Sequence, residues 1–300
     1  MTIYAIIVTY NAMRRNWIDR CMQSLQGSTI SVKPIVVDNN SIDGTRKHVP
    51  EHYPEAVWLP QDKNIGFGQA NNVGINYALQ HNADYVMLLN QDAAIMPDTL
   101  SLLLKESDGI SLITPIHLNG NGSQFDINFQ KYTLPSNKNI PDNIAECRLK
   151  KGHFIIGEVC AACWLLPAHI LKTIGGFNPL FFQYGEDNNY YDRLVYHHIK
   201  SFLVPSAEIH HDRQGYGDSN VYNNKKIRRT LLLLFCDINQ SFWSCTKELI
   251  WHLKECFFHK LPNCQYMPGT LFVELIWIMS HSILILKSRR KEKRTGMHWL

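Results

Sequence analysis

Four segments of this chain each end an apolar, strand-like run with polar or acidic side chains. They are IIVTYN at 6–11, VVDNNSIDGT at 36–45, LLNQDA at 88–93 and FFQYGED at 181–187. A nearly unbroken apolar strand is typical of a sheet that is covered by helices on both faces. Open sheets of this kind bind their ligands at the carboxyl ends of the strands. The four segments therefore predict an α/β fold whose functional site lies where these strands end.

The sequence between the apolar runs has helical periodicity. The alternation of strand and helix up to about residue 116 predicts a mostly parallel central sheet with right-handed crossovers, flanked by helices. Residues 117–152 are rich in Asn, Gly, Pro and Lys and are expected to form an excursion over the site. A helix is expected over 186–198, and only helical patterns remain beyond about residue 222. We therefore expect an α/β domain at 1–220 and a helical C-terminal appendage at 221–300.

Charge is unevenly distributed along the 300 residues, although the net charge is only +4. Residues 221–300 carry 13 Lys and Arg against 5 Asp and Glu, whereas residues 1–220 carry 17 against 21. The basic end indicates contact with an anionic surface, and the acidic body suits a metal site. A hydrophobic share of 45% and an aromatic share of 11% exclude a disordered chain. No nucleic-acid partner is expected.

The eight cysteines are scattered and lie mostly in apolar runs. A chain of this length does not need disulfides, so reduced thiols in the cytosol are expected. Cys160 and Cys163 form a CxxC pair, which is typical of redox or zinc sites, but no second pair accompanies it and a buried strand is favoured. Met1 leads directly into an apolar strand without a basic leader, so we expect no signal peptide and a cytoplasmic location.

Polar side chains that suit a nucleotide follow the second apolar run. The Asp38 carboxylate can accept from the imide N–H of a uracil or thymine base, and the amides of Asn39 and Asn40 can bind ribose or base edges. The alternative is a turn built from good turn formers. The strand before these residues and the Asp-Gly-Thr helix start after them favour the binding site.

The loop at 64–74 resembles a dinucleotide-binding glycine loop, but Asn71 replaces the third glycine and the loop does not follow the first strand. A better interpretation is that Asn64, Gly66 and Gly68 let the chain pass close to a diphosphate sugar. Asn71 or Asn72 would then be an amide donor. Helix packing through small residues is the alternative, and both can hold.

The third apolar run ends in Asn90, Gln91 and Asp92. One carboxylate, with diphosphate oxygens and waters, makes a normal Mg²⁺ or Mn²⁺ site. Asn90 and Gln91 are expected to contact the nucleotide sugar beside the metal. His211 follows a later strand and is a candidate second metal ligand, since imidazole suits Mn²⁺ better than Mg²⁺. A helix-cap role for Asp92 and an ordinary histidine at 211 are the alternatives.

Glu186 and Asp187 follow an aromatic, glycine-bearing approach and begin the helix expected at 186–198. Two carboxylates in a first turn are favoured by the helix dipole, which is the structural alternative. A carboxylate beside aromatic residues can also act as a general base toward an acceptor hydroxyl. We favour the catalytic interpretation.

The C-terminal region contains a 16-residue apolar run, LFVELIWIMSHSILIL at 271–286, followed by the basic KSRRKEKR at 287–294. The run is short of the roughly 20 residues that cross a bilayer. An interfacial helix with a basic anchor is favoured, and a core helix with a solvated tail is the alternative. The expected location is therefore cytoplasmic, with contact to the inner face of the cell membrane.

Taken together, these segments resemble family 2 glycosyltransferases of the rhamnosyltransferase-like branch. The matching segments span roughly residues 3–215 and are VTYN, VVDNNSIDGT, NIGFGQANNVG, LLNQDA, GGFNPLFFQYGED and PSAEIHH. The resemblance implies a GT-A fold and an inverting, metal-dependent transfer from a UDP- or dTDP-sugar to a glycan or lipid-linked glycan, in cell-surface polysaccharide synthesis. It implies nucleotide binding by Thr9, Tyr10, Asn11, Asp38 and Asn40.

The same resemblance implies that Asp92 binds the metal as the last residue of a DxD-type motif. Asp187 would be the base, with Glu186 as its neighbour, and His211 matches the histidine after the last sheet strand. Two positions depart from the pattern: Asn90 replaces the first acid of DxD, and Asn189 stands where many relatives have a further acid. A sugar nucleotidyltransferase and a catalytically silent binding relative remain as alternatives.

Overall fold

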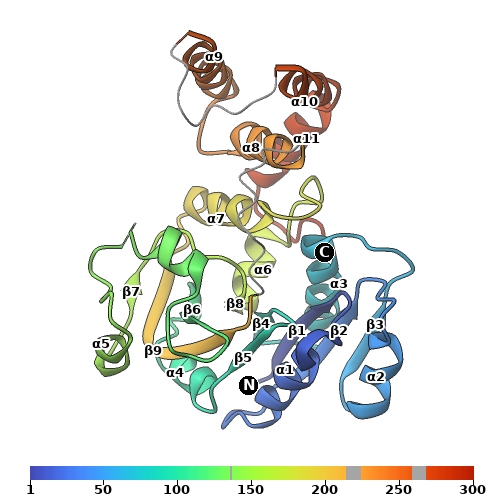
Figure 1. The fold of residues 1–300 in the computed structure, drawn as a ribbon, viewed down its shortest axis with the longest axis vertical. Coiled ribbons are helices and arrows are strands. Elements are labelled where there is room, and N and C mark those ends of the chain that lie inside the picture. The colour runs from blue at the N-terminus through green and yellow to red at the C-terminus, as the bar shows by residue number, and fades with distance from the viewer. Residues whose placement is uncertain (136, 214–223, 259–267) are drawn as a thin grey trace.

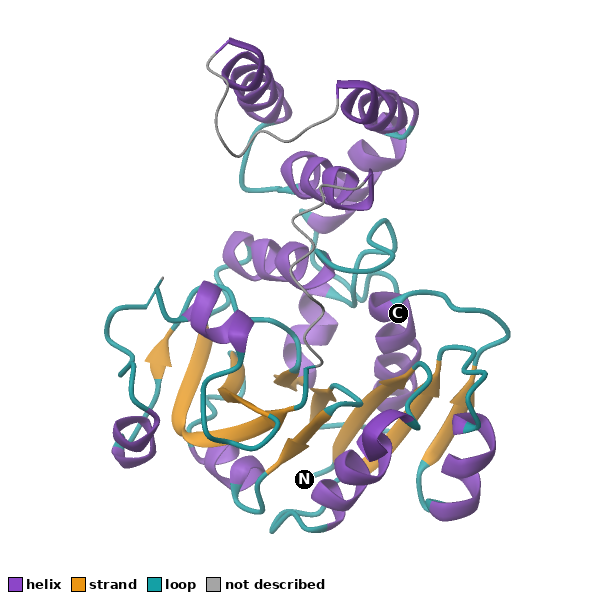
Figure 2. Ribbon diagram, in the orientation of Figure 1, coloured by secondary structure: helices purple, strands orange, loops and turns teal. Residues whose placement is uncertain are grey.

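The computed structural model describes residues 1–135, 137–213, 224–258 and 268–300 of the chain. A nine-stranded sheet lies between helices in the order β3-β2-β1-β4-β8-β6-β9-β5, with β7 paired to β9 (Figures 1 and 2). The strands are β1 (Ile3–Thr9), β2 (Lys33–Asp38), β3 (Val57–Pro60), β4 (Tyr85–Leu89), β5 (Ala93–Ile95), β6 (Leu112–Asn119), β7 (Phe154–Ile155), β8 (Cys163–Pro167) and β9 (Ser201–His211).

The first half of the sheet is parallel, as the apolar runs predict. β1 pairs in parallel with β2 and β4, and β2 pairs in parallel with β3. In this register Thr9 lies opposite Asp38, and Asp38 lies opposite Pro60. The polar ends of the first and second runs therefore meet at one edge of the sheet.

The second half of the sheet is mixed, so the sheet is less uniformly parallel than expected. β8 is antiparallel to β4 and β6, and β9 is antiparallel to β5 and β7. β9 is parallel to β6, which makes four of the eight pairings between these strands parallel. The antiparallel β5–β9 pair places Ala93 opposite His211, and so brings the end of the third run beside the end of β9.

Helices cover both faces of the sheet. They are η1 (Arg14–Asn16), α1 (Trp17–Gln26), α2 (Thr45–His52), α3 (Phe67–Gln80), α4 (Thr99–Lys105), η2 (Phe129–Thr133), α5 (Ile144–Leu149), α6 (Ala168–Ile174) and α7 (Glu186–Tyr196). Alternate residues of β1 enter different cores, because successive strand side chains point to opposite faces. Ile6 and Val8 pack with the α3 side, whereas Ala5 and Ile7 pack with the α1 side.

The C-terminal helices form a separate apolar cluster beyond α7 (Figure 1). They are α8 (Asn224–Cys236), α9 (Phe242–Phe258), α10 (Pro268–Ser280) and α11 (Ser282–Glu292). Within the described residues no single helix is long and apolar enough to span a bilayer. The segments 271–280 and 282–292 reach the required length and apolarity only when they are taken together, and they meet at a 62° bend. The described cysteines, which exclude Cys256 and Cys264, are all free thiols.

The end of the chain returns to the α/β body. Gly296 N donates to Thr173 O at 2.8 Å, and Gly176 N donates to His298 O at 2.8 Å. The buried Arg193 of α7 lies 3.8 Å from Glu292 of α11. The α/β domain expected at 1–220 therefore also packs against the last residues of the appendage expected at 221–300.

Candidate active site

The buried Asp38 carboxylate holds together the ends of β1 and β2. Thr9 Oγ1 donates to its Oδ1 at 3.0 Å, and Ser41 donates to it through both Oγ and N. Arg46 Nε lies 3.3 Å from Oδ2, so the buried charge is paired. In this structure the carboxylate organises the loop, and its contact with a nucleotide base stays a prediction.

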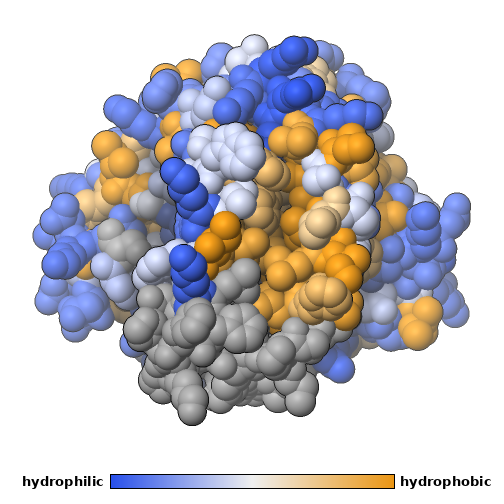
Figure 3. Space-filling model, turned by 90° about the horizontal axis from the view of Figure 1, so that it is seen from above, coloured by the Kyte–Doolittle hydropathy of each residue, from blue (hydrophilic) through white to orange (hydrophobic). Residues whose placement is uncertain are grey.

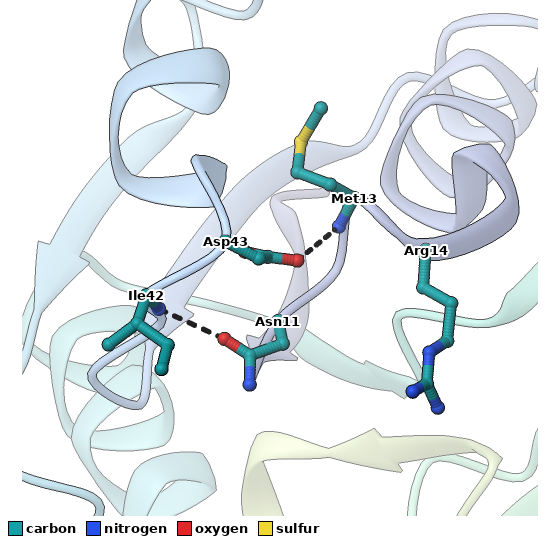
Figure 4. A pocket seen from close by; sticks show the side chains of 5 residues that line it. All are labelled: Asn11, Met13, Arg14, Ile42 and Asp43. Atoms are coloured by element: carbon teal, nitrogen blue, oxygen red, sulfur yellow. Dashed lines mark hydrogen bonds between the residues drawn. The ribbon is translucent and has the colours of Figure 1, made fainter.

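The loops after β1 and β2 border an open pocket of ≈ 640 Å³ (Figure 4). Asn11, in the left-handed region at φ 53°, accepts from Ile42 N at 2.9 Å and donates its own N–H to Ser41 Oγ at 2.9 Å. Tyr10 beside it is 48% exposed. The pocket is lined by Asn11, Met13, Arg14, Ile42 and Asp43. An exposed ring beside a wide hollow lined by both polar and apolar side chains suits a planar base and its ribose.

Gln91 and Asn40 both have backbone or side-chain partners within these loops. Gln91 accepts from Tyr10 N at 2.8 Å and donates to Tyr10 O at 3.2 Å, which ties the end of β4 to the loop after β1. Asn40, at φ 64°, accepts from Arg46 Nη1 at 3.3 Å. Gln91 therefore positions the loop after β1 through its amide, and its expected contact with the nucleotide sugar stays a prediction.

The glycine loop approaches other parts of the chain, which supports the packing alternative. Gly66 has φ 86°, and a Cβ built on it would lie 2.1 Å from Phe182 O. A Cβ on Gly68 would lie 2.9 Å from Phe177 Cβ. Glycine is therefore required here so that α3 can pack against the segment leading to α7. These contacts account for both glycines without a sugar.

The asparagines of the same loop are also held by the chain. Asn72 is buried, donates to Phe177 O at 2.8 Å and accepts from Phe177 N at 2.6 Å, so its expected role as a sugar ligand is corrected to a backbone clamp. Asn71 donates to Phe67 O within its own helix. Asn64 accepts from Gly66 N and from the Asn39 side chain.

Asp92 and His211 lie together, as predicted. His211 Nε2 is 3.2 Å from Asp92 Oδ1 and 3.4 Å from Asn90 Nδ2. Asn90 Oδ1 is buried and has no hydrogen-bond partner. A buried oxygen without a partner is costly unless something else binds it. The Asp92 carboxylate and the His211 imidazole fit a divalent cation whose remaining ligands come from a diphosphate and water, and the unpartnered oxygen of Asn90 is available at the same strand end.

Asp126, within the 117–152 excursion, orients His211 from behind. Its Oδ2 lies 3.4 Å from His211 Nδ1, so a proton on Nδ1 leaves the Nε2 lone pair facing Asp92. A carboxylate behind a ligating histidine is the usual partner arrangement at metal sites. Burial opposes protonation of His211, but the charges of Asp92 and Asp126 outweigh it and raise its pKa. Burial opposes ionisation of Asp126, but His211 and Arg213 outweigh it and lower the pKa of that carboxyl.

Glu186 and Asp187 have unlike environments at the start of α7. Glu186 is 5% exposed and its Oε2 has no partner, and burial, followed by the charge of Asp187, raises its pKa to about 8. Asp187 is half-buried and accepts from Asn188 N at 3.0 Å. Burial raises its pKa too, while that hydrogen bond and the Arg213 charge oppose the rise. Burial and the charge of Asp187 therefore favour the protonated form of Glu186, while the Asn188 N–H and the charge of Arg213 favour the charged form of Asp187.

Arg213 joins the metal-type cluster to the α7 carboxylates. Its Nε donates to Asp126 Oδ2 at 2.9 Å, and its Nη2 donates to Cys160 Sγ at 3.5 Å. Burial works to lower the pKa of Arg213, but the charges of Cys160, Asp126 and Asp92 outweigh it and raise that pKa. Burial raises the pKa of Asp187, and the charge of Arg213 opposes that rise. Arg213 is therefore bonded to Asp126 and interacts electrostatically with Asp92 and Asp187, which links the predicted metal ligand to the predicted base.

Residues 4–157 of the chain match the family model described as "Glycosyl transferase family 2". The chain belongs to glycosyl transferase family 2.

Two curated relatives are rhamnosyltransferases. One is an N-acetylglucosaminyl-diphospho-decaprenol L-rhamnosyltransferase of Mycobacterium tuberculosis, 25% identical in an alignment of 271 positions. The alignment covers 79% of this chain and 85% of the relative. The other, the dTDP-rhamnosyl transferase RfbF of Shigella flexneri, is 26% identical over 125 residues, 41% of each chain.

Solved structures show the same fold. A crystal structure of GalNAc-T7 with UDP, GalNAc and Mn²⁺ matches with a TM-score of 0.64 at 13% identity, over 100% of this chain and 55% of that chain. A crystal structure of S. aureus TarS 1–349 matches with a TM-score of 0.58 at 14% identity, over 98% and 88%. The GT-A-type fold expected from the sequence is therefore confirmed.

In this family 2 glycosyltransferase, sequence analysis missed three site residues. Asp126 lies in the excursion, which has no periodicity to mark it, and Arg213 follows His211 by two positions. Glu158 lies at the rim of the site and accepts from Asn188 Nδ2. Desolvation at the rim and the charge of Asp187 raise the pKa of Glu158 to about 7. The motif IHHDR, with its basic residue after the histidines, was the available signal for Arg213.

Proposed function

We propose that this family 2 glycosyltransferase transfers a sugar from a nucleoside diphosphate donor to a hydroxyl of a lipid-linked glycan, with inversion at the anomeric carbon. The observations that support the proposal are the contact between Asp92 and His211 and the electrostatic interaction of Arg213 with both Asp92 and Asp187. The activities of the two rhamnosyltransferase relatives make dTDP-rhamnose the first donor to test, with UDP-sugars as the comparison. Cell-surface polysaccharide synthesis is the proposed setting.

Asp187 removes the proton from the acceptor hydroxyl in the proposed reaction. The acceptor oxygen then attacks the anomeric carbon from the face opposite the diphosphate, the bond from that carbon to the diphosphate oxygen breaks, and the nucleoside diphosphate leaves. The N-terminus of α7 and the charge of Arg213 favour the charged form of Asp187 that a base requires, and burial favours the protonated form of the neighbouring Glu186. No covalent enzyme intermediate is formed.

Asp92, His211 and Asn90 would hold a divalent cation, Mn²⁺ or Mg²⁺. When bound, such a cation offsets the charge that develops on the leaving diphosphate. Asp126 fixes the imidazole of His211 in the tautomer that binding requires, and Asn11 with Tyr10 borders the pocket for the nucleoside. The free thiols of the described cysteines support the cytosol as the compartment in which the reaction takes place.

Replacement of the base tests the mechanism. Asp187→Asn should lower the transfer rate by about 100-fold or more, since a general base contributes 10²–10⁴-fold. Asp192→Asn, on the same helix but bonded through its backbone to Asn239, is the matched control and should retain activity. Asp187→Asn transferring at the rate of the unaltered enzyme, with the fold intact, would exclude Asp187 as the base.

Product analysis separates the alternatives. Transfer releases a nucleoside diphosphate, whereas a nucleotidyltransferase releases pyrophosphate and a silent relative releases neither. NMR coupling at the new anomeric centre reports inversion, and retention of configuration would contradict the direct displacement. Activity that survives complete removal of divalent cations would contradict the assigned role of Asp92 and His211.

A further inference from the structure

We infer that the tip formed by α9, α10 and α11 docks on an anionic lipid bilayer and thereby orients the active site toward the membrane. Hydrophobic side chains gather on the end of the molecule that carries these helices, as Figure 3 shows. The exposed large apolar side chains on this tip are Trp243, Ile250, Trp251, Phe272, Val273, Ile276, Met279, Ile283, Leu284 and Leu286. A continuous exposed apolar surface of this kind marks a contact site.

The outward side of α10 is apolar and free of acid. Phe272, Val273, Ile276 and Met279 recur at helical spacing and are 51–73% exposed. The acid of this helix, Glu274, is turned inward, where Arg228 donates to its two oxygens at 2.6 and 3.1 Å. An amphipathic helix in a protein of this size normally turns its apolar side inward. In α10 the charged side chain faces the interior and the apolar side chains face outward, which suits contact with an apolar environment.

The outward side of α9 adds indole rings and lysines. Trp243, Lys247, Ile250, Trp251 and Lys254 are exposed and recur every three or four residues, so they share one helix face. Tryptophan and lysine with an aliphatic residue on one face are typical of helices that lie in the membrane interface.

A group of exposed cations lies in the second half of α11 and in the two residues after it, and we call it the basic collar: Lys287, Arg290, Lys291, Lys293 and Arg294. Ile283 and Arg290 are seven residues apart, which is about 10 Å along a helix. Interfacial helices bury their apolar side about 5–10 Å deep, so the basic collar would reach the phosphates of the headgroups. Arg289 is excluded from the collar, because it is buried and donates to Phe235 O at 2.9 Å.

Charge favours a bilayer over a second copy of the chain as the occupant. Two copies meeting at the tip would bring five like charges from each collar together, whereas anionic headgroups neutralise them. The 62° bend between the two halves of the bent pair, 271–280 and 282–292, favours helices that lie on the surface. The proposed contact is therefore interfacial.

The C-terminal helices pack against the segment that leads to the catalytic helix. Phe181, six residues before Asp187, belongs to the apolar cluster of α8, α9 and α10. The Arg229 guanidinium of α8 lies 6.0 Å from the centre of the Tyr184 ring. Docking of the tip would thus hold the start of α7 at a fixed height above the headgroups. This last step rests on the proposed function, since a lipid-linked acceptor would then be presented to Asp187 from the bilayer.

Vesicle binding of the full chain tests the inference without any sugar substrate. The full chain should co-sediment with vesicles of phosphatidylcholine and 30% phosphatidylglycerol, and only weakly with pure phosphatidylcholine. The triple variant Lys287→Glu, Arg290→Glu, Lys291→Glu should bind anionic vesicles about 100-fold more weakly. The matched control, Lys138→Glu, Lys150→Glu, Lys151→Glu, makes the same charge change on exposed residues of the body and should bind normally.

A second variant tests insertion of the apolar tip. Met279→Gln with Ile283→Gln changes exposed side chains, so folding should be retained, and binding to anionic vesicles should fall at least tenfold. Three results would each overturn the inference. They are unchanged vesicle binding by this variant, an equal loss of binding in the basic-collar variant and the body control, and no vesicle binding by the unaltered chain at low salt. Dimerisation of the unaltered chain that the Met279 and Ile283 changes abolish, without vesicle binding, would assign the surface to a second copy and also overturn it.

Activity on two forms of acceptor separates this inference from the proposed function. The basic-collar variant should transfer normally to a water-soluble acceptor with a short lipid, and poorly to a long-chain acceptor in anionic vesicles. Equal activity of the variant on both forms would overturn the orienting role. Failure of the unaltered enzyme on every acceptor would instead refute the proposed function and leave vesicle binding as an independent result.

Discussion

Replacement of Asp126 by Asn isolates the contribution of the carboxylate behind His211. Asp126 Oδ1 accepts from Asn128 N at 3.0 Å and from Phe129 N at 3.1 Å, and an Asn Oδ1 can keep both bonds. The other oxygen faces His211 Nδ1 at 3.4 Å and Arg213 Nε at 2.9 Å, and becomes an NH₂ group. The change therefore removes the acceptor that His211 and Arg213 share, while the two backbone hydrogen bonds to Oδ1 are kept.

The expected loss is one of metal affinity. Removal of a carboxylate that orients a ligating histidine typically costs 10–100-fold, which is about 1.4–2.8 kcal/mol of binding free energy. Asp126→Asn should therefore bind Mn²⁺ about 10–100-fold more weakly in isothermal titration calorimetry with UDP or dTDP present. Since Asp126 works to raise the pKa of His211, that pKa should also fall in the metal-free variant, as followed by NMR.

Asp212→Asn is the matched control for this experiment. Asp212 is also a carboxylate beside the site, but it accepts from Trp17 Nε1 at 3.1 Å and from Arg20 Nη1 at 3.2 Å, away from the His211 ring. The control should bind Mn²⁺ nearly as the unaltered enzyme does. Unchanged Mn²⁺ affinity in Asp126→Asn, or an equal loss in both variants, would refute the role assigned to Asp126.

Three further outcomes are expected. Because the pKa of Glu186 is raised from 4.5 to about 8, the folded state keeps a proton that the unfolded chain loses, and stability falls as pH rises through this interval. Glu186→Gln cannot ionise, so the Tm of this variant relative to the unaltered enzyme, measured by scanning fluorimetry, should rise from pH 5 to pH 8. A Tm difference that does not change with pH would contradict the raised pKa of Glu186. Arg193→Met removes buried donors to Ile174 O and Gly176 O. It should lower the free energy of unfolding, measured in urea, by about 3–5 kcal/mol. A decrease below about 1 kcal/mol would contradict a stabilising role for these two hydrogen bonds. Asn90→Asp adds a charge to the metal ligands and should tighten Mn²⁺ binding roughly tenfold in calorimetry, and weaker binding would exclude position 90 as a ligand.

Much of the site could be predicted because it depends on local pattern and one rule of topology. The apolar runs that became β1, β2 and β4 are buried on both faces, and the polar residues after them lie at one edge of the sheet. Asp92, His211 and Asp187 were predicted as site residues for this reason. The helix expected at 186–198 is observed as α7, Glu186–Tyr196.

The rest depends on contacts between distant parts of the chain. Gly66 and Asn72 have the composition of a ligand loop, and only the folded chain shows that Phe182 and Phe177 occupy the space beside them. The mixed pairing of β8 between β4 and β6 is likewise set by long-range packing. Asp126 could not be predicted, since it lies outside any strand or helix and is brought to His211 by the excursion alone.

Because the last residues of the chain pack on the α/β body, the helical region is connected to that body at both of its ends. Asn178 Nδ2 donates to Ser288 Oγ at 2.7 Å and to Glu292 Oε1 at 2.9 Å, so these bonds would be lost from a chain cut after β9. A minimal enzyme is therefore better designed by internal excision of the helices, with residues 288–300 rejoined through a short linker, than by truncation. A purification tag is likewise better fused before Met1 than after Leu300, which packs against the main core.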